Sequence, residues 1–193
     1  MKKLLIFYSH PSHDGCHGYL LKGVRERLDS AGAAYELIDL YAINYDPLLK
    51  NAELYSAGRY EVSAQNREFQ DKIQTADRLL FIYPTWWGNL PAMMKGFFER
   101  VFISRFAFRY KFNVPFGLLK GKKAAVFSAT GGPALYNNLI LLRQPVRLVT
   151  WDILALCGIR SQGFLLSSAR RLDDRNKKRL DRVAARIVRY LMR

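Results

Sequence analysis

Short apolar segments of strand length alternate along the chain with longer segments that carry helical spacing or helix boundary signals. The expected strands are residues 3–9, 35–40, 78–83, 123–128 and 161–166. The expected helices are residues 18–31, 63–76, 91–103, 145–156 and 172–191. Because parallel strands need a crossover connection long enough to hold a helix, this alternation predicts an α/β fold. We therefore expect a doubly wound, five-stranded parallel sheet with helices on both faces.

The chain is long enough and apolar enough for a single domain over residues 1–193, since half of its residues are hydrophobic. This composition excludes a disordered, collagen-like or coiled-coil chain. No apolar run approaches the ~20 residues that cross a bilayer, and the loop after the first strand offers no small-residue cleavage site, so we expect no secretory signal. Only two cysteines, Cys16 and Cys157, are present, which favours a reducing, cytoplasmic location.

The chain is strongly basic, because 31 lysines and arginines against 16 acidic residues give a net charge of +15. The excess is concentrated in residues 120–193, which contain 16 basic and 4 acidic side chains. Such a field favours phosphates, anionic lipid, nucleic acid or other acidic partners. In the helix expected over residues 172–191, one apolar face is suited to packing on the sheet. Its basic side is either solvated or in contact with an anionic surface or partner.

Ligands of a doubly wound sheet bind outside the carboxyl ends of its strands, which here directs attention to the loops after Ser9, Tyr83 and Ser128. The first loop leads into a helix start, where free backbone N–H groups and the helix dipole attract phosphate. It contains all three histidines of the chain, so a metal site and a purely structural loop are the alternatives. We expect no metal, because phosphate binding explains the histidines equally well. The metal-ligand candidates considered are His10, His13, Asp14, Cys16 and His17.

The second and third loops also contain residues suited to a ligand. Trp86 and Trp87 follow a buried strand, where a flat aromatic ligand could stack on them or where they could simply close the core. Gly131 and Gly132 present unshielded N–H groups, and Tyr136 adds a phenol donor, although an ordinary strand-to-helix turn would look the same. Three such loops at one sheet edge favour a shared site over any single loop taken alone.

Residues 83–102 are the most specific part of the sequence: Tyr83-Pro-Thr-Trp-Trp-Gly-Asn-Leu-Pro-Ala-Met-Met-Lys-Gly-Phe-Phe-Glu-Arg-Val-Phe102. Together with Thr130-Gly-Gly132 and Asp39-Leu-Tyr-Ala42, this segment resembles the flavodoxin-like NAD(P)H:quinone oxidoreductase family over nearly the whole chain. The resemblance implies a flavodoxin-like fold and a homodimer that binds FAD or FMN at its interface. It also implies NADPH or NADH as the hydride donor, a quinone or similar acceptor, and a ping-pong cycle.

The resemblance also implies the roles of particular residues. The positions that hold the phosphate end of the flavin are His10, Cys16 and His17. The positions that line the isoalloxazine edge are Thr85, Trp86, Trp87 and Gly88. The positions that face its pyrimidine side are Ala129, Thr130, Gly131 and Gly132, with the catalytic candidate Tyr136 nearby. The segment that covers the ring and contacts nicotinamide or quinone matches Ala107, Phe108 and Arg109.

The chain departs from the family pattern at four places, one of which is the loop of Gly131 and Gly132, one residue shorter than in the best-studied relatives. Gly15 stands where relatives often have a phosphate-binding serine, and Cys16 replaces a common phenylalanine, so the phosphate contacts are expected to differ. No histidine follows Tyr136 within the next turns, which argues against a Tyr–His proton relay.

Two other functions compete with the enzyme interpretation. Residues 104–112 interleave cations with aromatic rings, as in proteins that stack single-stranded nucleic acid, but their position just after the most specific segment favours a lid over the site. Some relatives are cytoplasmic ancillary subunits of membrane potassium efflux transporters, so a regulatory, interaction-based role is the second hypothesis.

Overall fold

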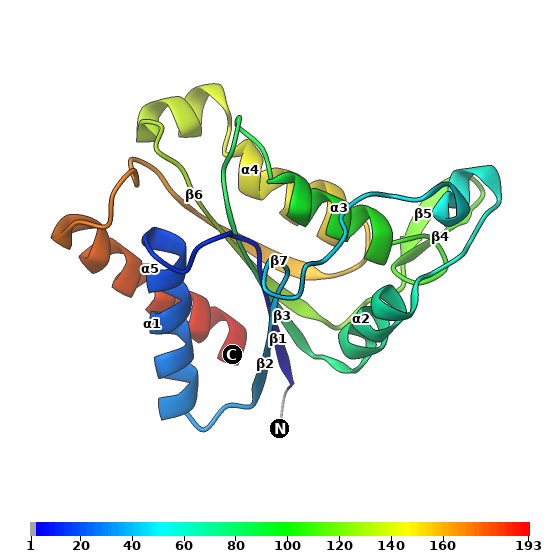
Figure 1. Cartoon of the computed structure of the whole chain (residues 1–193), viewed down its shortest axis with the longest axis horizontal. Helices are drawn as coiled ribbons and strands as arrows, with labels where there is room; N and C mark the ends of the chain where they lie inside the picture. Colours follow the sequence, from blue (N-terminus) through cyan, green and yellow to red (C-terminus); the bar gives the residue numbers. More distant parts are fainter. Residues whose placement is uncertain (1–2) are drawn as a thin grey trace.

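Five parallel strands form the central sheet of the computed structural model, which describes residues 3–193 (Figure 1). The strands are β1 (Leu4–Tyr8), β2 (Tyr35–Asp39), β3 (Arg78–Pro84), β6 (Lys123–Ala129) and β7 (Arg160–Leu166). Their spatial order is β2-β1-β3-β6-β7, and every neighbouring pair is parallel. The predicted five-stranded parallel sheet is confirmed. The order reverses between β1 and β3, which is where a sheet of this type opens a crevice for ligands.

Helices cover both faces of this sheet. α1 (Cys16–Ser30) and α5 (Asp174–Met192) lie side by side on one face, at the left of Figure 1. α2 (Ala64–Thr75) and α3 (Ala92–Val101) lie on the other face. The buried apolar side chains accordingly form two clusters, one in each layer. Because β1 is buried on both faces, its sequence is apolar throughout rather than alternating.

The helices α2 and α5 begin near their predicted positions, and each start is capped by a side chain. Ser63 Oγ accepts a 3.2 Å hydrogen bond from the backbone N–H of Asn66 at the start of α2. The carboxylate of Asp173 accepts a 2.7 Å bond from the N–H of Asn176 at the start of α5. α3 begins directly after Pro91. Within residues 3–193, no helix has the length and apolar character needed to span a membrane.

The helix predicted over residues 145–156 is present, but most of it is π-helical rather than α-helical. A short α-helix, α4 (Gln144–Arg147), continues into the π-helical segment η4 (Leu148–Ala155). Thr150 donates its hydroxyl to the carbonyl of Val146 (2.9 Å), and such side-chain bonds compete with regular helical pairing. Another π-helical segment, η3 (Tyr136–Ile140), follows β6.

The long connection between α3 and β6 contains a β-hairpin that the apolar periodicity did not predict. β4 (Phe108–Lys111) pairs antiparallel with β5 (Val114–Gly117), at the right of Figure 1. The turn residues Phe112 and Asn113 have φ of 52° and 60°, as in a type I′ turn. Phenylalanine at the first turn position hides the usual Asn-Gly signal for this hairpin.

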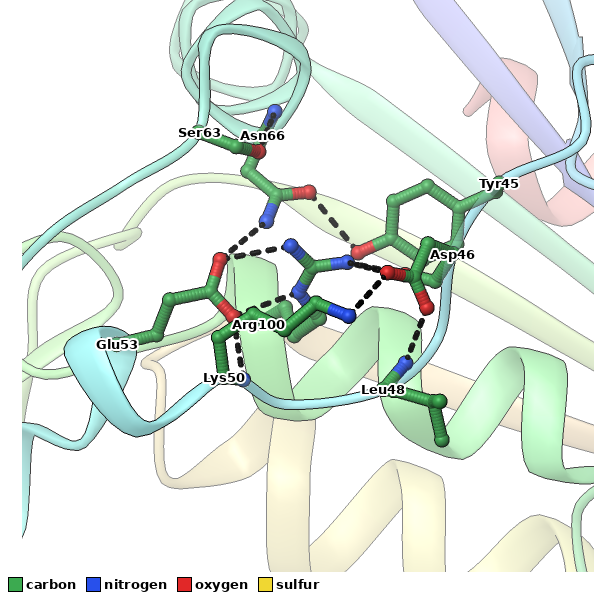
Figure 2. A network of polar contacts seen from close by, with 8 residues as sticks. All are labelled: Tyr45, Asp46, Leu48, Lys50, Glu53, Ser63, Asn66 and Arg100. Atoms are coloured by element: carbon green, nitrogen blue, oxygen red, sulfur yellow. Dashed lines mark hydrogen bonds and ion pairs between the residues drawn. The ribbon is translucent and has the colours of Figure 1, made fainter.

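The other long connection, residues 41–62, is held against α3 by a buried ion pair (Figure 2). Two short 3₁₀ helices, η1 (Asn51–Glu53) and η2 (Tyr55–Ala57), lie in this segment. Glu53 accepts hydrogen bonds of 2.7 and 2.8 Å from the guanidinium of Arg100, and both side chains are buried. The pair therefore ties a loop of low helical content to a helix of the core layer.

Further polar groups complete this network. Arg100 also donates to the backbone carbonyl of Asp46. Tyr45 donates its hydroxyl to Asn66 Oδ1 at 2.9 Å (Figure 2). Burial opposes the ionisation of Glu53, but the hydrogen bonds from Arg100 hold the pKa of this carboxyl below its usual value. The network thus keeps Glu53 charged and paired inside the fold.

We predict that Arg100→Leu lowers the free energy of unfolding by about 3–5 kcal/mol, because it leaves the buried Glu53 carboxylate without its partner. Urea unfolding followed by circular dichroism measures the loss. Glu99→Gln, which breaks the exposed Lys95–Glu99 pair on the same helix, is the matched control and should cost less than about 1 kcal/mol. Equal losses for the two variants would contradict a structural role for the buried pair.

Candidate functional site

The loop from β1 to α1 places two histidine rings in a stack. The rings of His10 and His17 lie 5.0 Å apart between centroids with an interplanar angle of 20°, and the ring of Trp86 lies 6.1 Å from that of His10. His10 Nδ1 lies 2.7 Å from the carbonyl oxygen of Ser12, which fixes the ring within the loop. The first and second loops therefore meet at His10.

His17 is buried in the first turn of α1, where only 8% of it is exposed. Burial, followed by repulsion from His10, lowers the pKa of His17 from 6.5 to about 3, so the imidazole is neutral at neutral pH. Across residues 3–193, two buried side-chain polar atoms find no hydrogen-bond partner, and these are His17 Nε2 and Ser9 Oγ. Such atoms cost about 1–3 kcal/mol each, and in native folds they call for a ligand or water as their partner.

The start of α1 is suited to an anion. Its N-terminal boundary is Gly15, with no side-chain cap, so the first backbone N–H groups are not satisfied by a capping side chain. Gly15 has a φ of 90°, a conformation that residues with a side chain adopt only with strain, so glycine is favoured at this position. A phosphate is the ligand that uncapped N–H groups and the helix dipole favour.

The thiol of Cys16 points to a different part of the chain. Its Sγ lies 3.7 Å from the carbonyl oxygens of both Ala169 and Arg171, in the segment before α5, and the residue is buried. Burial, and then the charge of Asp173, raises the pKa of this thiol. Of Cys16, only the backbone N–H is therefore suited to a phosphate contact.

The loop from β3 to α3 exposes its two tryptophans. Trp86 and Asn89 exchange two backbone hydrogen bonds of 3.0 Å around a tight turn whose central residues, Trp87 and Gly88, have φ of 52° and 72°. A bulky residue with positive φ is strained, and such strain gathers at functional sites. Trp87 is fully exposed and Trp86 is 41% exposed, so neither closes the core. Of the two alternatives, a surface for stacking fits better than core packing.

Thr85 joins the second loop to the third. Its Oγ1 lies 2.7 Å from Ser128 Oγ, and its backbone N–H donates to the carbonyl of Ala129 at 3.0 Å. Ala129 is itself buried as the last residue of β6. Both residues therefore position the loops, and their side chains offer little surface to a ligand.

The glycine loop is closed by internal bonds that sequence reasoning did not foresee. Gly132 donates its N–H to Thr130 Oγ1 (3.1 Å), so one of the two glycine N–H groups already has an acceptor. The N–H of Gly131 has none among residues 3–193, whereas its carbonyl accepts from Arg170 Nε at 3.2 Å. The buried amide of Asn137 donates to the carbonyl of Gly132 at 2.9 Å. Of the two glycines, Gly131 is therefore the one whose N–H is open to a ligand.

Tyr136 begins η3 directly after this loop and is 49% exposed. The polar support of the loop comes from Asn137 and from the segment after β7, where Ser167 Oγ lies 3.1 Å from the Asn137 amide. Asn137, Ser167 and Arg170 were missed because nothing in their sequence spacing shows that β7 ends beside β6. The asparagine directly after Tyr136 was the one feature of the sequence that could have indicated this polar support.

The structure does not bring residues 107–109 to the three loops of the same chain. Ala107 and Phe108 are buried, and the ring of Phe108 packs against Tyr55 at 6.1 Å between centroids. Arg109 is exposed on the hairpin. In Figure 1 the hairpin lies at the right end of the molecule, whereas the three loops lie at the left and top. This segment could cover a site only in a second copy of the chain.

The remaining histidine of the first loop, His13, lies apart from the other two. Its Nε2 lies 2.5 Å from a carboxylate oxygen of Asp39 at the end of β2, and its ring stacks on Tyr8. The part of the chain that the structure describes contains no group of three or more His, Cys, Asp or Glu side chains arranged to hold a metal ion. The histidines therefore serve two different local arrangements.

Comparisons with known proteins identify the family to which this chain belongs. The family model described as a flavodoxin-like fold matches residues 2–191. The chain is 33% identical over 180 residues to the ribosyldihydronicotinamide dehydrogenase (quinone) of Mus musculus, which covers 82% of this chain and 78% of that protein. The chain belongs to the flavodoxin-like quinone oxidoreductase family. The family suggested by residues 83–102 is therefore confirmed.

Other members of this family agree in sequence and in structure. An uncharacterized NAD(P)H oxidoreductase of Haemophilus influenzae is 27% identical over 184 residues, which is 94% of this chain and 91% of that protein. The solved NAD(P)H:quinone oxidoreductase from Methanothermobacter marburgensis superposes with a TM-score of 0.85 at 28% identity and covers 100% of this chain and 98% of that one. The similarity thus extends over the whole sheet and all three loops.

We predict that His17 makes the protein less stable in mild acid. Its pKa is depressed in the folded state, so between pH 6.5 and about 3 the unfolded chain binds a proton that the folded chain does not. The free energy of unfolding therefore falls as the pH falls, by roughly 1 kcal/mol per pH unit from this group. Chemical unfolding of wild type and His17→Asn between about pH 7 and 5 measures it, since few carboxyls titrate there. Parallel pH profiles would contradict the prediction.

Proposed function

We propose that this protein is a cytoplasmic, flavin-dependent oxidoreductase that passes hydride from NADH or NADPH through bound FAD or FMN to a quinone or similar acceptor in a ping-pong cycle. The convergence of three loops at one sheet edge is the observation that supports this most. It brings an uncapped helix start, two exposed tryptophans and an open glycine N–H to one place. The names of the Mus musculus and Methanothermobacter marburgensis proteins agree with this proposal.

The residues present fit a flavin at its phosphate end. The uncapped N–H groups at the start of α1, including that of Cys16, would bind phosphate oxygens, and His10 stands beside them. His17 Nε2, which has no partner among the described residues, would gain one from the ligand or from water that the ligand orders. Because the buried imidazole of His17 is neutral at neutral pH, it adds no fixed positive charge, and the N–H dipoles at the start of α1 provide attraction for the phosphate.

The residues at the ring end provide a flat surface and hydrogen-bond donors. Trp86 and Trp87 offer exposed indoles beside His10, a surface on which a planar ring system can stack. The Gly131 N–H and the Tyr136 hydroxyl are donors for negative charge that develops at the pyrimidine edge. When bound, a flavin supplies the two-electron chemistry that connects a nicotinamide to a quinone. The protein orients the successive ligands and stabilises this charge.

A homodimer is part of the proposal because large apolar side chains are exposed in two clusters. The hairpin cluster consists of Tyr110, Phe112, Val114 and Phe116. The second cluster, which follows the glycine loop, consists of Leu135, Tyr136, Leu139, Ile140 and Leu142. A cavity of about 260 Å³ between α3, η4 and the hairpin adds further apolar surface. Monomeric proteins rarely expose patches of this extent, so a second copy whose hairpin covers the site fits the structure.

The proposed function predicts a yellow protein with one flavin per chain after incubation with FAD or FMN. Under anaerobic conditions NADH or NADPH should bleach the bound flavin, and a quinone should restore its colour. Tyr136→Phe should slow quinone reduction about tenfold, because a half-exposed hydroxyl can be replaced in part by water. Stopped-flow absorbance measures both half-reactions.

Tyr35→Phe is the matched control for this test, because the hydroxyl it removes contacts Arg25, at a distance from the three loops. It should leave both half-reactions unchanged. A protein that binds neither FAD nor FMN would contradict the proposed function. Unchanged rates in Tyr136→Phe would exclude only the role of its hydroxyl.

The proposed dimer predicts that Phe112→Lys weakens self-association by at least about tenfold, because this 88% exposed ring would lie buried against the second copy. Sedimentation equilibrium measures the association constant. Leu48→Lys changes an equally apolar residue, 67% exposed, that belongs to neither cluster, and should not alter association. A wild-type chain that sediments as a monomer with full flavin-dependent activity would rule out the dimer.

A further inference from the structure

The outer face of α5 carries a continuous row of cations. The row consists of Arg175, Lys178, Arg182, Arg186 and Arg189, all of them exposed. Because they follow one another by three or four residues, they share roughly 80° of the helix circumference over a length of roughly 21 Å. We call this row the basic stripe. It accounts for much of the charge concentrated in the last third of the chain.

The opposite face of α5 is packed inside the fold. Leu180, Ala184, Ile187 and Leu191 are buried in the layer that α5 forms with α1. The helix therefore has no free apolar face with which to insert into another environment. The helix lies on the outside of the molecule, and its exposed side presents mainly charged residues (Figure 1).

The charge of the basic stripe is not neutralised within residues 3–193. No member of the stripe forms an ion pair there. The acidic residues of α5 have other contacts: Asp174 pairs with Lys177 at 3.4 Å, and Asp181 accepts from the hydroxyl of Tyr19 at 3.4 Å. Holding like charges side by side without compensation is unfavourable, so the row is suited to an external anion array.

We propose that the basic stripe is a docking surface for a membrane that contains anionic phospholipids. Clusters of four to eight lysines and arginines on one helix face are attracted to such a surface. Four of the five members are arginines, whose guanidinium groups form paired hydrogen bonds to phosphate oxygens. A straight row on an outer helix can bring all five cations to a flat layer of headgroups at once. The proposal is independent of the redox function.

The same row is poorly suited to nucleic acid. By helical geometry, no aromatic side chain of α5 stands among the five cations to stack on bases. No Asn or Gln side chain stands there to recognise base edges either. Binding to an anionic lipid surface needs neither aromatic nor amide side chains, because it depends on charge and on a flat contact surface.

Flotation of the full chain with vesicles tests the proposal. The protein should float with vesicles of mixed phosphatidylcholine and phosphatidylglycerol, should not float with phosphatidylcholine alone, and should be released at high salt. Arg182→Glu combined with Arg189→Glu should weaken binding at least about thirtyfold, because two attractions become repulsions. Arg182→Lys combined with Arg189→Lys keeps the charge and should retain most of the binding.

The matched control is Arg67→Glu combined with Lys120→Glu, which changes the net charge by the same amount outside α5, at two exposed cations that form no ion pair with any residue of 3–193. It should weaken binding far less than the stripe variant. Equal weakening by the two variants would overturn the proposal, since net charge alone would then explain the binding. Failure of the wild type to float, or tighter binding to duplex DNA than to anionic vesicles at the same salt, would also overturn it. Thermal unfolding confirms that each variant is folded.

Discussion

Burial of β1 between two helical layers is the constraint on which the site depends. Both faces of this strand are apolar and covered, so the chain can place polar or exposed groups only where a strand ends. All five strands run parallel, and their carboxyl ends therefore meet at one edge. The carboxyl ends of β1, β3 and β6 at this edge are followed by His10, Thr85 and Thr130, respectively. Loops that are distant in sequence therefore form one site. Any chain that buries these strands must bring those loops together.

Some buried polar groups of the molecule have all their hydrogen-bond partners within the fold, and others lack one. The first kind stabilises the fold, and the second kind indicates a ligand site. In the connection over residues 41–62, Glu53 and Arg100 satisfy each other and their neighbours, so the network is complete without a ligand. At the sheet edge, His17 Nε2 lacks a partner among the described residues, and Trp87 adopts a strained conformation with its ring in solvent. Strain and unmet hydrogen bonds persist where the remaining fold is stable enough to hold them. Their concentration at one edge indicates a place for a ligand.

Much of the fold could be predicted because it follows from local patterns. The strands, the helix over residues 63–76 and the order of the three loops all derive from apolar runs and boundary residues that each act within a few positions. Side-chain direction could not be predicted in this way. The Cys16 thiol turns toward Ala169, and Asn137 closes the glycine loop, because residues 166–170 return beside β6. The contacts of Cys16 with Ala169 and of Asn137 with Ser167 join positions 153 and 30 residues apart, and no local period in the sequence records them.

The two layers on the sheet present different surfaces to their surroundings. The layer of α1 and α5 buries its apolar side chains and turns a row of cations outward. The layer of α3 and η4 leaves Trp151 and the rings of the hairpin exposed. A net charge of +15 keeps copies of the chain apart in solution, and self-association through the apolar layer must overcome that repulsion. The five cations of the basic stripe lie on α5, on the opposite face of the sheet, so this part of the charge stays away from the apolar layer when copies meet there. The position of the basic stripe therefore lowers the repulsion that pairing through the apolar layer must overcome.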